Sequence, residues 1–262
     1  MLNVLLTGQL TWNIPLLVIF AAITIVYVYL IVRYRLRLKP MQPVLFLIGI
    51  WLFYLVTGSP LLAISYLSFS FHMIQMSFLF FIIPPLILLG IPQALYQKFI
   101  NPPFIQKVNK FNLTPKIALI AFGTLFLLYH LPFMLTFVSQ DDLLQKTYIT
   151  VLFILSFRMW WPIASPNPRE RVLKRERKKY LFQSSIYIMP ACIVFIVSAL
   201  LEGVNNPFIG QMMTHLCLPA DQTIQVLPPP FNTKYDQMIA GVFMLGLHKV
   251  GLMVTCRLER KC

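Results

Sequence analysis

The 262-residue chain has few charged residues and few groups suited to catalysis. Charged side chains make up 11% of the sequence and only eight are acidic, whereas 58% of residues are hydrophobic and the mean hydropathy is +0.74. This balance excludes an ordinary soluble domain. Walker and dinucleotide-binding motifs and internal repeats are also missing. The four cysteines form no CxxC pair, so they indicate neither a zinc site nor a disulfide framework.

Long hydrophobic runs are what the sequence has in abundance. A helix needs roughly 20 apolar residues to cross the hydrocarbon core of a bilayer. Seven such runs predict an all-α, polytopic membrane protein with one domain over residues 1–262. The N-terminus lacks the positive charge of a secretory signal, so we expect the first span to be retained. The spans are expected at about 13–32, 42–57, 69–90, 116–138, 143–164, 181–201 and 235–256.

The positions of the basic residues predict how this domain is oriented. Twenty of the 22 lysines and arginines fall in four clusters that follow the first, third, fifth and seventh spans. Basic loops are retained on the cytoplasmic side, so we expect the N-terminus outside and the C-terminus in the cytoplasm. The net charge of +14 then reflects topology and contact with anionic membrane lipid, including at the basic loop 165–180, and nucleic-acid binding is not expected.

Histidines inside the apolar spans are the first candidates for function, because ionisable groups in a bilayer are costly. His72 is expected about one turn below the outer surface in the third span, with Met76 at i+4 on the same face. His130 is expected in the outer half of the fourth span, with Met134 one turn nearer the surface. The two pairs lie at similar depths and converge if their faces point inward. His248, deeper in the seventh span, is expected to be structural.

Imidazole with thioether sulfur is a ligand set that suits Cu(I), whereas magnesium and calcium need oxygen ligands and structural zinc prefers thiolates. The sequence therefore predicts a Cu(I) site at the outer leaflet, with the ligands His72, Met76, His130 and Met134. A loop on the same side resembles a point of metal capture, because six residues contain Met212, Met213, His215 and Cys217. Weak thioether ligands would let copper bind and leave, as delivery requires.

Polar residues beside these ligands are expected to orient them or to control access. They are Gln75 and Tyr129, next to the two histidine positions, and Asp236 and Gln237, which open the seventh span. A carboxylate at Asp236 also complements the N-terminus of its helix. Its further role as a hydrogen-bond partner of a ligating histidine is a second possibility.

Short motifs, in order along the chain, resemble those of one protein family. The segment Phe71 to Met76, with Pro84, Pro85 and then Gly90-Ile91-Pro92, is similar to the histidine-methionine-x-glutamine-histidine signature and trailing prolines of the CtaG family. The likeness continues in Tyr129-His130-Leu131-Pro132, Trp161-Pro162 and Asp236-Gln237. Met76 stands where the family pattern has a second histidine, which keeps the i+4 geometry and makes the site softer.

The resemblance implies a multi-pass protein of the bacterial cell membrane that assists assembly of a caa-type cytochrome c oxidase, with the oxidase subunits as partners. It is not expected to be an enzyme, since the spans offer no paired acids and no nucleophile with a convincing base. Two alternatives stay open. One is haem handling with His72 and His130 as axial ligands, and the other is transport of a metal ion or small solute.

Overall fold

A computed structural model describes residues 12–36, 38–100, 114–201 and 229–260, and no strand occurs in these ranges. Six helical segments in the described chain are long and apolar enough to cross a membrane. Five are single helices: α2 (Ile14–Arg33), α3 (Met41–Gly58), α11 (Asp142–Ala164), α12 (Lys174–Leu201) and α14 (Lys234–Leu258). The sixth is built from α5 (Phe69–Ser77), the π-helix η1 (Phe78–Ile82) and α6 (Ile83–Gly90).

A seventh span is formed only if two bent helices cross as one unit. These are α9 (Pro115–Tyr129) and α10 (Pro132–Ser139). The short elements α4 (Leu61–Ser65), α7 (Gln93–Leu95), η2 (Tyr96–Ile100) and η4 (Pro168–Glu170) lie in connections. The helical membrane architecture predicted from the sequence is confirmed, with six or seven candidate spans, whereas the orientation with the N-terminus outside stays a prediction.

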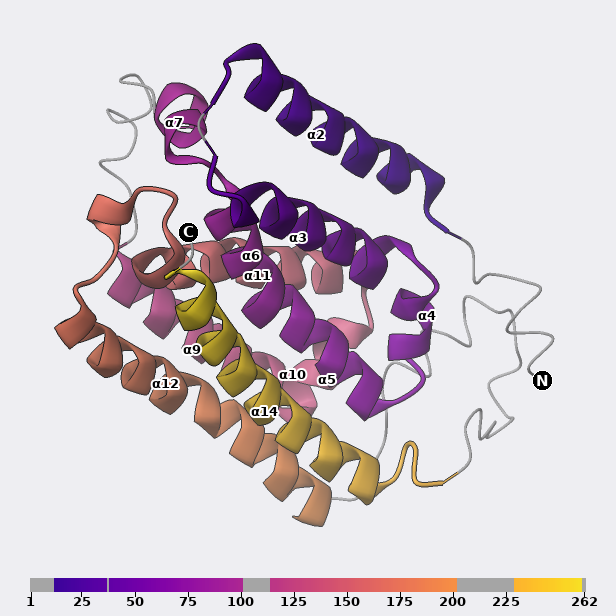
Figure 1. The fold of residues 1–262 in the computed structure, drawn as a ribbon. Coiled ribbons are helices and arrows are strands. Elements are labelled where there is room, and N and C mark those ends of the chain that lie inside the picture. Colours follow the sequence, from indigo (N-terminus) through magenta and orange to yellow (C-terminus); the bar gives the residue numbers. More distant parts are fainter. Residues whose placement is uncertain (1–11, 37, 101–113, 202–228, 261–262) are drawn as a thin grey trace.

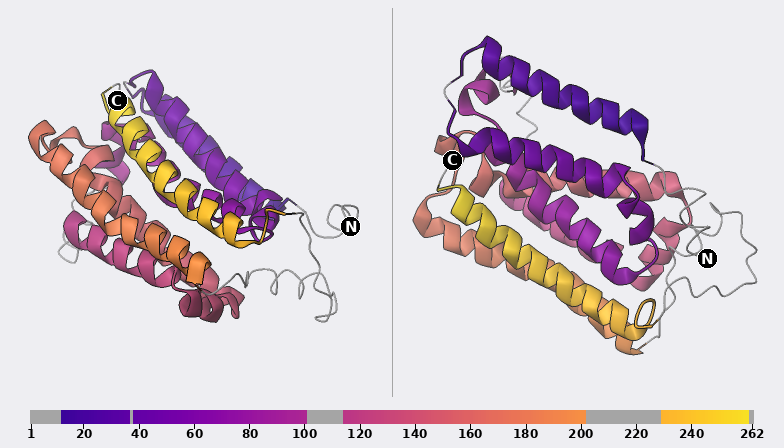
Figure 2. Two further views of the ribbon diagram at one scale, coloured as in Figure 1. Left: turned by 90° about the horizontal axis from the view of Figure 1, so that it is seen from below. Right: turned by 45° about the vertical axis from the view of Figure 1, so that its right-hand side comes forward.

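The third span lies at the centre of the bundle. In its most apolar stretch 83% of residues are buried, against 11% in α2. Figure 1 and Figure 2 show α2 at the edge of the bundle next to α3. On the side of the bundle away from α2, α12 and α14 lie side by side. The segment α5–η1–α6 runs between α3 and α14 (Figure 1). Residues on this central span therefore face protein on nearly every side.

Several helices begin where the sequence supplies a capping side chain. Asn13 accepts a hydrogen bond from the amide of Leu16 at the start of α2, and Asp141 accepts from the amides of Leu143 and Leu144 at the start of α11. Such caps satisfy amides that have no partner within the first turn of a helix. They explain why these spans begin within a residue of the predicted positions.

The fourth predicted span, 116–138, is not one continuous helix. α9 ends at Tyr129, and α10 begins at Pro132 after a bend of 83°. Pro132 has no amide hydrogen to continue the helix, and its ring disfavours helical backbone at the preceding Leu131, which is extended. The expectation that His130 and Met134 lie one turn apart on one helix is therefore wrong.

The third span contains a second irregularity that prolines explain. Pro84 and Pro85 lack the amide hydrogens that the carbonyls of Phe80 and Phe81 would accept in an α-helix. The chain forms the π-helix η1 at this point. The carbonyl of Phe80 instead accepts a hydrogen bond of 2.9 Å from the indole of Trp160 on α11. A buried tryptophan thus supports the altered turn.

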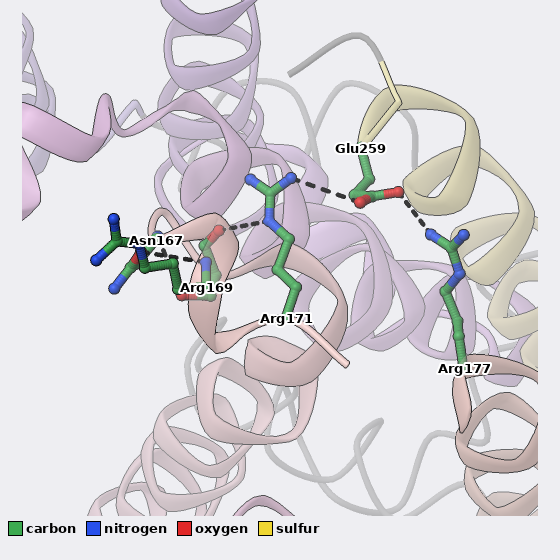
Figure 3. Close-up of polar contacts among 6 residues, drawn as sticks. Asn167, Arg169, Arg171, Arg177 and Glu259 are labelled. Atoms are coloured by element: carbon green, nitrogen blue, oxygen red, sulfur yellow. Dashed lines mark hydrogen bonds and ion pairs between the residues drawn. The ribbon is translucent and has the colours of Figure 1, made fainter. Parts of the chain in front are cut away.

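At the end of the bundle where α14 terminates, two arginines share one carboxylate (Figure 3). A Glu259 carboxylate oxygen lies 2.5 Å from the guanidinium of Arg177 on α12, and the other lies 3.7 Å from Arg171 in the loop after α11. Arg171 also donates to the carbonyl of Ser165 at 2.8 Å. These contacts hold the ends of α11, α12 and α14 together.

Candidate functional site

The His130 side chain lies at the break between α9 and α10 and is fully buried. Its Nδ1 lies 2.6 Å from the carbonyl oxygen of Phe126, and its Nε2 lies 3.3 Å from the sulfur of Met73. A carbonyl oxygen can only accept, so Nδ1 carries the hydrogen in the neutral ring. Nε2 therefore presents a lone pair to the Met73 thioether, and two soft-metal donors face one another.

Met73 is a residue that the sequence analysis did not include among the ligands. It follows His72 on α5, and its side chain is fully buried. The i+4 rule selected Met76 and Met134 because it considers only neighbours on one helix. Which residue of α5 meets His130 depends on how α5 is rotated toward α9. One weak signal is present in the sequence, since Met73 is itself a methionine within the predicted site segment.

His72 is brought to the same region through Tyr129. The Tyr129 hydroxyl lies 3.3 Å from Nε2 of His72, and the two rings stack with centroids 6.3 Å apart. The Tyr129 ring also meets the His130 ring in a T-shaped contact, with centroids 5.4 Å apart. The structure therefore brings together His72, Tyr129 and His130, three of the predicted residues.

A second tyrosine stacks on His72 from the connection between α4 and α5. The Tyr66 ring lies 6.3 Å from the His72 ring. Burial, and to a smaller degree the charge of Asp142, raise the pKa of Tyr66 to about 12. Tyr66 is therefore neutral at physiological pH. It contributes an uncharged aromatic wall to the site.

Asp236 caps a neighbouring helix in the structure. Its carboxylate accepts hydrogen bonds from the backbone amides of Phe69 and Ser70, the first residues of α5. It also accepts from the hydroxyls of Ser68 and Ser70 and from the amide of Asn232. Asp236 thus fixes the start of the helix that carries His72 and Met73.

The two glutamines tie helices together. Gln75 donates to the carbonyl of Val56 on α3 at 2.7 Å. Gln237 donates to the carbonyl of Phe195 and the hydroxyl of Ser198 on α12, at 3.1 and 2.8 Å. Both side chains are buried. They hold α5 and α14 in place around the histidines.

The remaining predicted ligands are more scattered. Met76 is buried on α5, one turn after His72, and Met134 is partly buried on α10, beyond the bend. His215 lies outside the described residues, as do the loop residues Met212, Met213 and Cys217. No group of three or more histidine, cysteine and acidic side chains that could hold a metal occurs in the described chain.

Comparison with known proteins gives one finding at the level of the family. A family model described as the cytochrome c oxidase caa3 assembly factor matches residues 25–257. No curated protein and no solved structure matches the chain. The matched range contains every residue of the site described above.

Proposed function

The chain belongs to the cytochrome c oxidase caa3 assembly factor family, and we propose that it serves this assembly by holding Cu(I) between His130 and Met73. It is a multi-pass membrane protein, and the proposed partners are the oxidase subunits that receive the metal. Copper is the cargo in this proposal. The predicted orientation places the ligands toward the outer face.

The observation that carries the proposal is the facing pair of donors. With Nδ1 engaged by the Phe126 carbonyl, no hydrogen lies between Nε2 of His130 and the Met73 sulfur, although the atoms are 3.3 Å apart. Nitrogen and sulfur ligands of one tetrahedral ion, at about 2.0 and 2.3 Å from the metal, lie about 3.5 Å apart. A small shift would admit an ion that both donors prefer.

The surroundings of the pair resemble those of a ligating histidine. Such histidines usually donate their second ring nitrogen to a carbonyl or carboxylate, which fixes the tautomer and the ring orientation. Phe126 supplies that carbonyl to His130. The His72 ring, which stacks on the same Tyr129 ring that contacts His130, is the next imidazole near the pair. We assign the thioether role to Met73 in preference to Met76 and Met134.

The same distance argues against a haem iron held axially by His130 and Met73, which is a different pair from the His72 and His130 of the haem alternative. Axial ligands on opposite faces of one haem iron, each at about 2.0 to 2.3 Å from the metal, would be separated by about 4 Å or more. Nε2 of His130 and the Met73 sulfur are 3.3 Å apart. The proposal predicts copper binding without a Soret band, whereas a Soret band would favour the haem alternative with His72 and His130 as axial ligands.

The test is anaerobic Cu(I) titration of the purified full chain in detergent, in competition with a Cu(I)-specific chelator. The variants His130→Ala and Met73→Leu should each weaken binding of one equivalent by at least about 100-fold, because loss of an outer hydrogen-bond partner alone typically costs 10–100-fold. Met253→Leu is the matched control, since Met253 is half exposed on α14. It should bind as the wild type does.

The consequence for assembly is measured in cells that depend on this protein. His130→Ala should leave the protein in the membrane and reduce the copper content of the mature oxidase, whereas Met253→Leu should not. Wild-type copper affinity in both ligand variants, together with normal oxidase, would refute the proposal.

A further inference from the structure

His248 is a buried histidine that the proposed copper site does not use. It lies in the second half of α14 and has 0% exposure. Neither of its ring nitrogens has a hydrogen-bond partner in the described chain. Buried polar groups are nearly always hydrogen-bonded, and each exception needs an explanation. His130, by contrast, uses one ring nitrogen on a backbone carbonyl.

Packing alone does not explain why residue 248 is a histidine. Its ring meets the ring of Phe81 in a T-shaped contact with centroids 4.9 Å apart. A phenylalanine would make that contact without burying two polar nitrogens. An ionisable group inside a membrane span points by default to function. The question is what the two nitrogens bind.

The depth of His248 follows from the pairing of α14 with the third span. The two helices run in the same direction, because Asp236 in the first turn of α14 caps Phe69 at the start of α5. Twelve residues further along each of the two helical segments, His248 meets Phe81. At about 1.5 Å per residue, His248 lies about 18 Å beyond Asp236 along the bundle.

The nearest soft ligand to His248 on its own helix is Met244. Residues four apart on a helix lie on the same face, with Cβ atoms about 5–6 Å apart. Met244 is also completely buried. By the same register, Met244 lies level with Ser77 of α5, whose buried hydroxyl likewise has no partner in the described chain. Buried side chains with unused lone pairs thus gather at successive turns.

Aromatic rings separate this region from the His130–Met73 pair. Phe126 contacts His130 with ring centroids 4.5 Å apart, Phe81 lies 5.8 Å from Phe126, and His248 lies beyond Phe81. Phe122 packs against both of these rings and Phe80 packs against Phe126 and Phe122, so the four phenylalanines form an aromatic layer. His248 therefore belongs to a different place in the bundle from the first site.

The backbone at this depth is adapted to bring α14 close to the third span. η1 places the Phe81 carbonyl against Gly251, where an added Cβ would lie 2.6 Å from that oxygen. Only glycine fits this approach. π-Helical turns occur frequently at functional sites. The irregular turn and the glycine together set His248 beside the aromatic layer.

From these observations we infer that His248 and Met244 form a second Cu(I) site on the far side of the aromatic layer. The inference rests on the proposed function, because it takes Cu(I) to be the metal that the chain carries. An imidazole nitrogen and a thioether sulfur on one face of α14 are again soft donors. Copper would then have two binding places along the membrane normal.

The test compares the number of Cu(I) equivalents bound by the full chain and its variants, in detergent and without oxygen. His248→Phe keeps the contact with Phe81 and should bind one equivalent fewer than the wild type. Met244→Leu keeps the volume and should weaken the same equivalent, which covers the case in which His248→Phe does not fold. Met253→Leu on the same helix should bind the full number.

Failures of the two proposals give different results. If His130→Ala binds the full number and His248→Phe binds one fewer, the second site holds and the first does not. If both variants bind one fewer and the double variant two fewer, both sites hold. Full binding and affinity in His248→Phe and in Met244→Leu would overturn the second site. The second site would also be overturned if the control Met253→Leu lost as much Cu(I) binding as His248→Phe and Met244→Leu.

Discussion

Asp236 supports a direct test of how the site is held, because its carboxylate joins α14 to the start of α5. In Asp236→Ala the amides of Phe69 and Ser70 lose their acceptor in a buried place, and the amide of the partly buried Asn232 loses its acceptor as well. A buried donor left unsatisfied costs about 1–3 kcal/mol. Because Asn232 is only partly buried, we take the lower value of about 1 kcal/mol for each amide. The expected loss of stability is about 3 kcal/mol.

The conservative variant Asp236→Asn should have a stability between those of the wild type and Asp236→Ala. In Asp236→Asn one oxygen still accepts, but the new NH₂ group faces donors, so about half of the loss is expected. The assay is equilibrium unfolding in mixed detergent micelles, followed by helical circular dichroism. Asp142→Asn is the matched control, because Asp142 is exposed and pairs with Lys146 at the surface. Such a pair contributes about 0.2–1 kcal/mol.

The order of stability among the three variants tests whether the Asp236 carboxylate holds the start of α5. Stability should decrease from Asp142→Asn to Asp236→Asn to Asp236→Ala. An Asp236→Ala protein within about 0.5 kcal/mol of the wild type would mean that the cap contributes little. The start of α5 would then be held by packing alone.

Two further predictions concern packing and the arginine pair of Figure 3. Gly90→Ala should lower stability by about 1–3 kcal/mol, since an added Cβ would collide with the backbone of Phe46 on α3. Gly246→Ala, which meets nothing within 4 Å, should be neutral or slightly stabilising when both are measured by detergent unfolding. Glu259→Gln should weaken both arginine contacts and speed limited proteolysis of the loop after α11, while Glu176→Gln, which no described arginine contacts, should not.

The helical architecture could be predicted because it depends on hydrophobic length and on local end signals. The predicted third span, 69–90, coincides with α5–η1–α6, and the last, 235–256, with α14 to within two residues. Pro132 is also visible in the sequence. Proline within a span can produce a mild kink or a complete break, and which of the two occurs depends on the neighbouring helices.

The site could be predicted only in part, because it lies between helices. The sequence pointed to His72 and His130 because histidines are unusual in apolar spans, and to Tyr129 because it is next to His130. It did not identify Met73, because its meeting with His130 depends on the rotation of α5 against α9. Spacing rules report neighbours within a helix and say nothing about that rotation.

The bend after His130 connects the fold to the proposed chemistry. If α9 continued to residue 138, as the sequence suggested, the His130 backbone would lie in mid-helix. Because α9 ends there, His130 takes the C-cap position, and its Nδ1 reaches the carbonyl of Phe126 one turn back. That hydrogen bond turns Nε2 toward α5. The proline that ends the helix thus fixes which nitrogen faces Met73, and the soft pair depends on the break as much as on its two ligands.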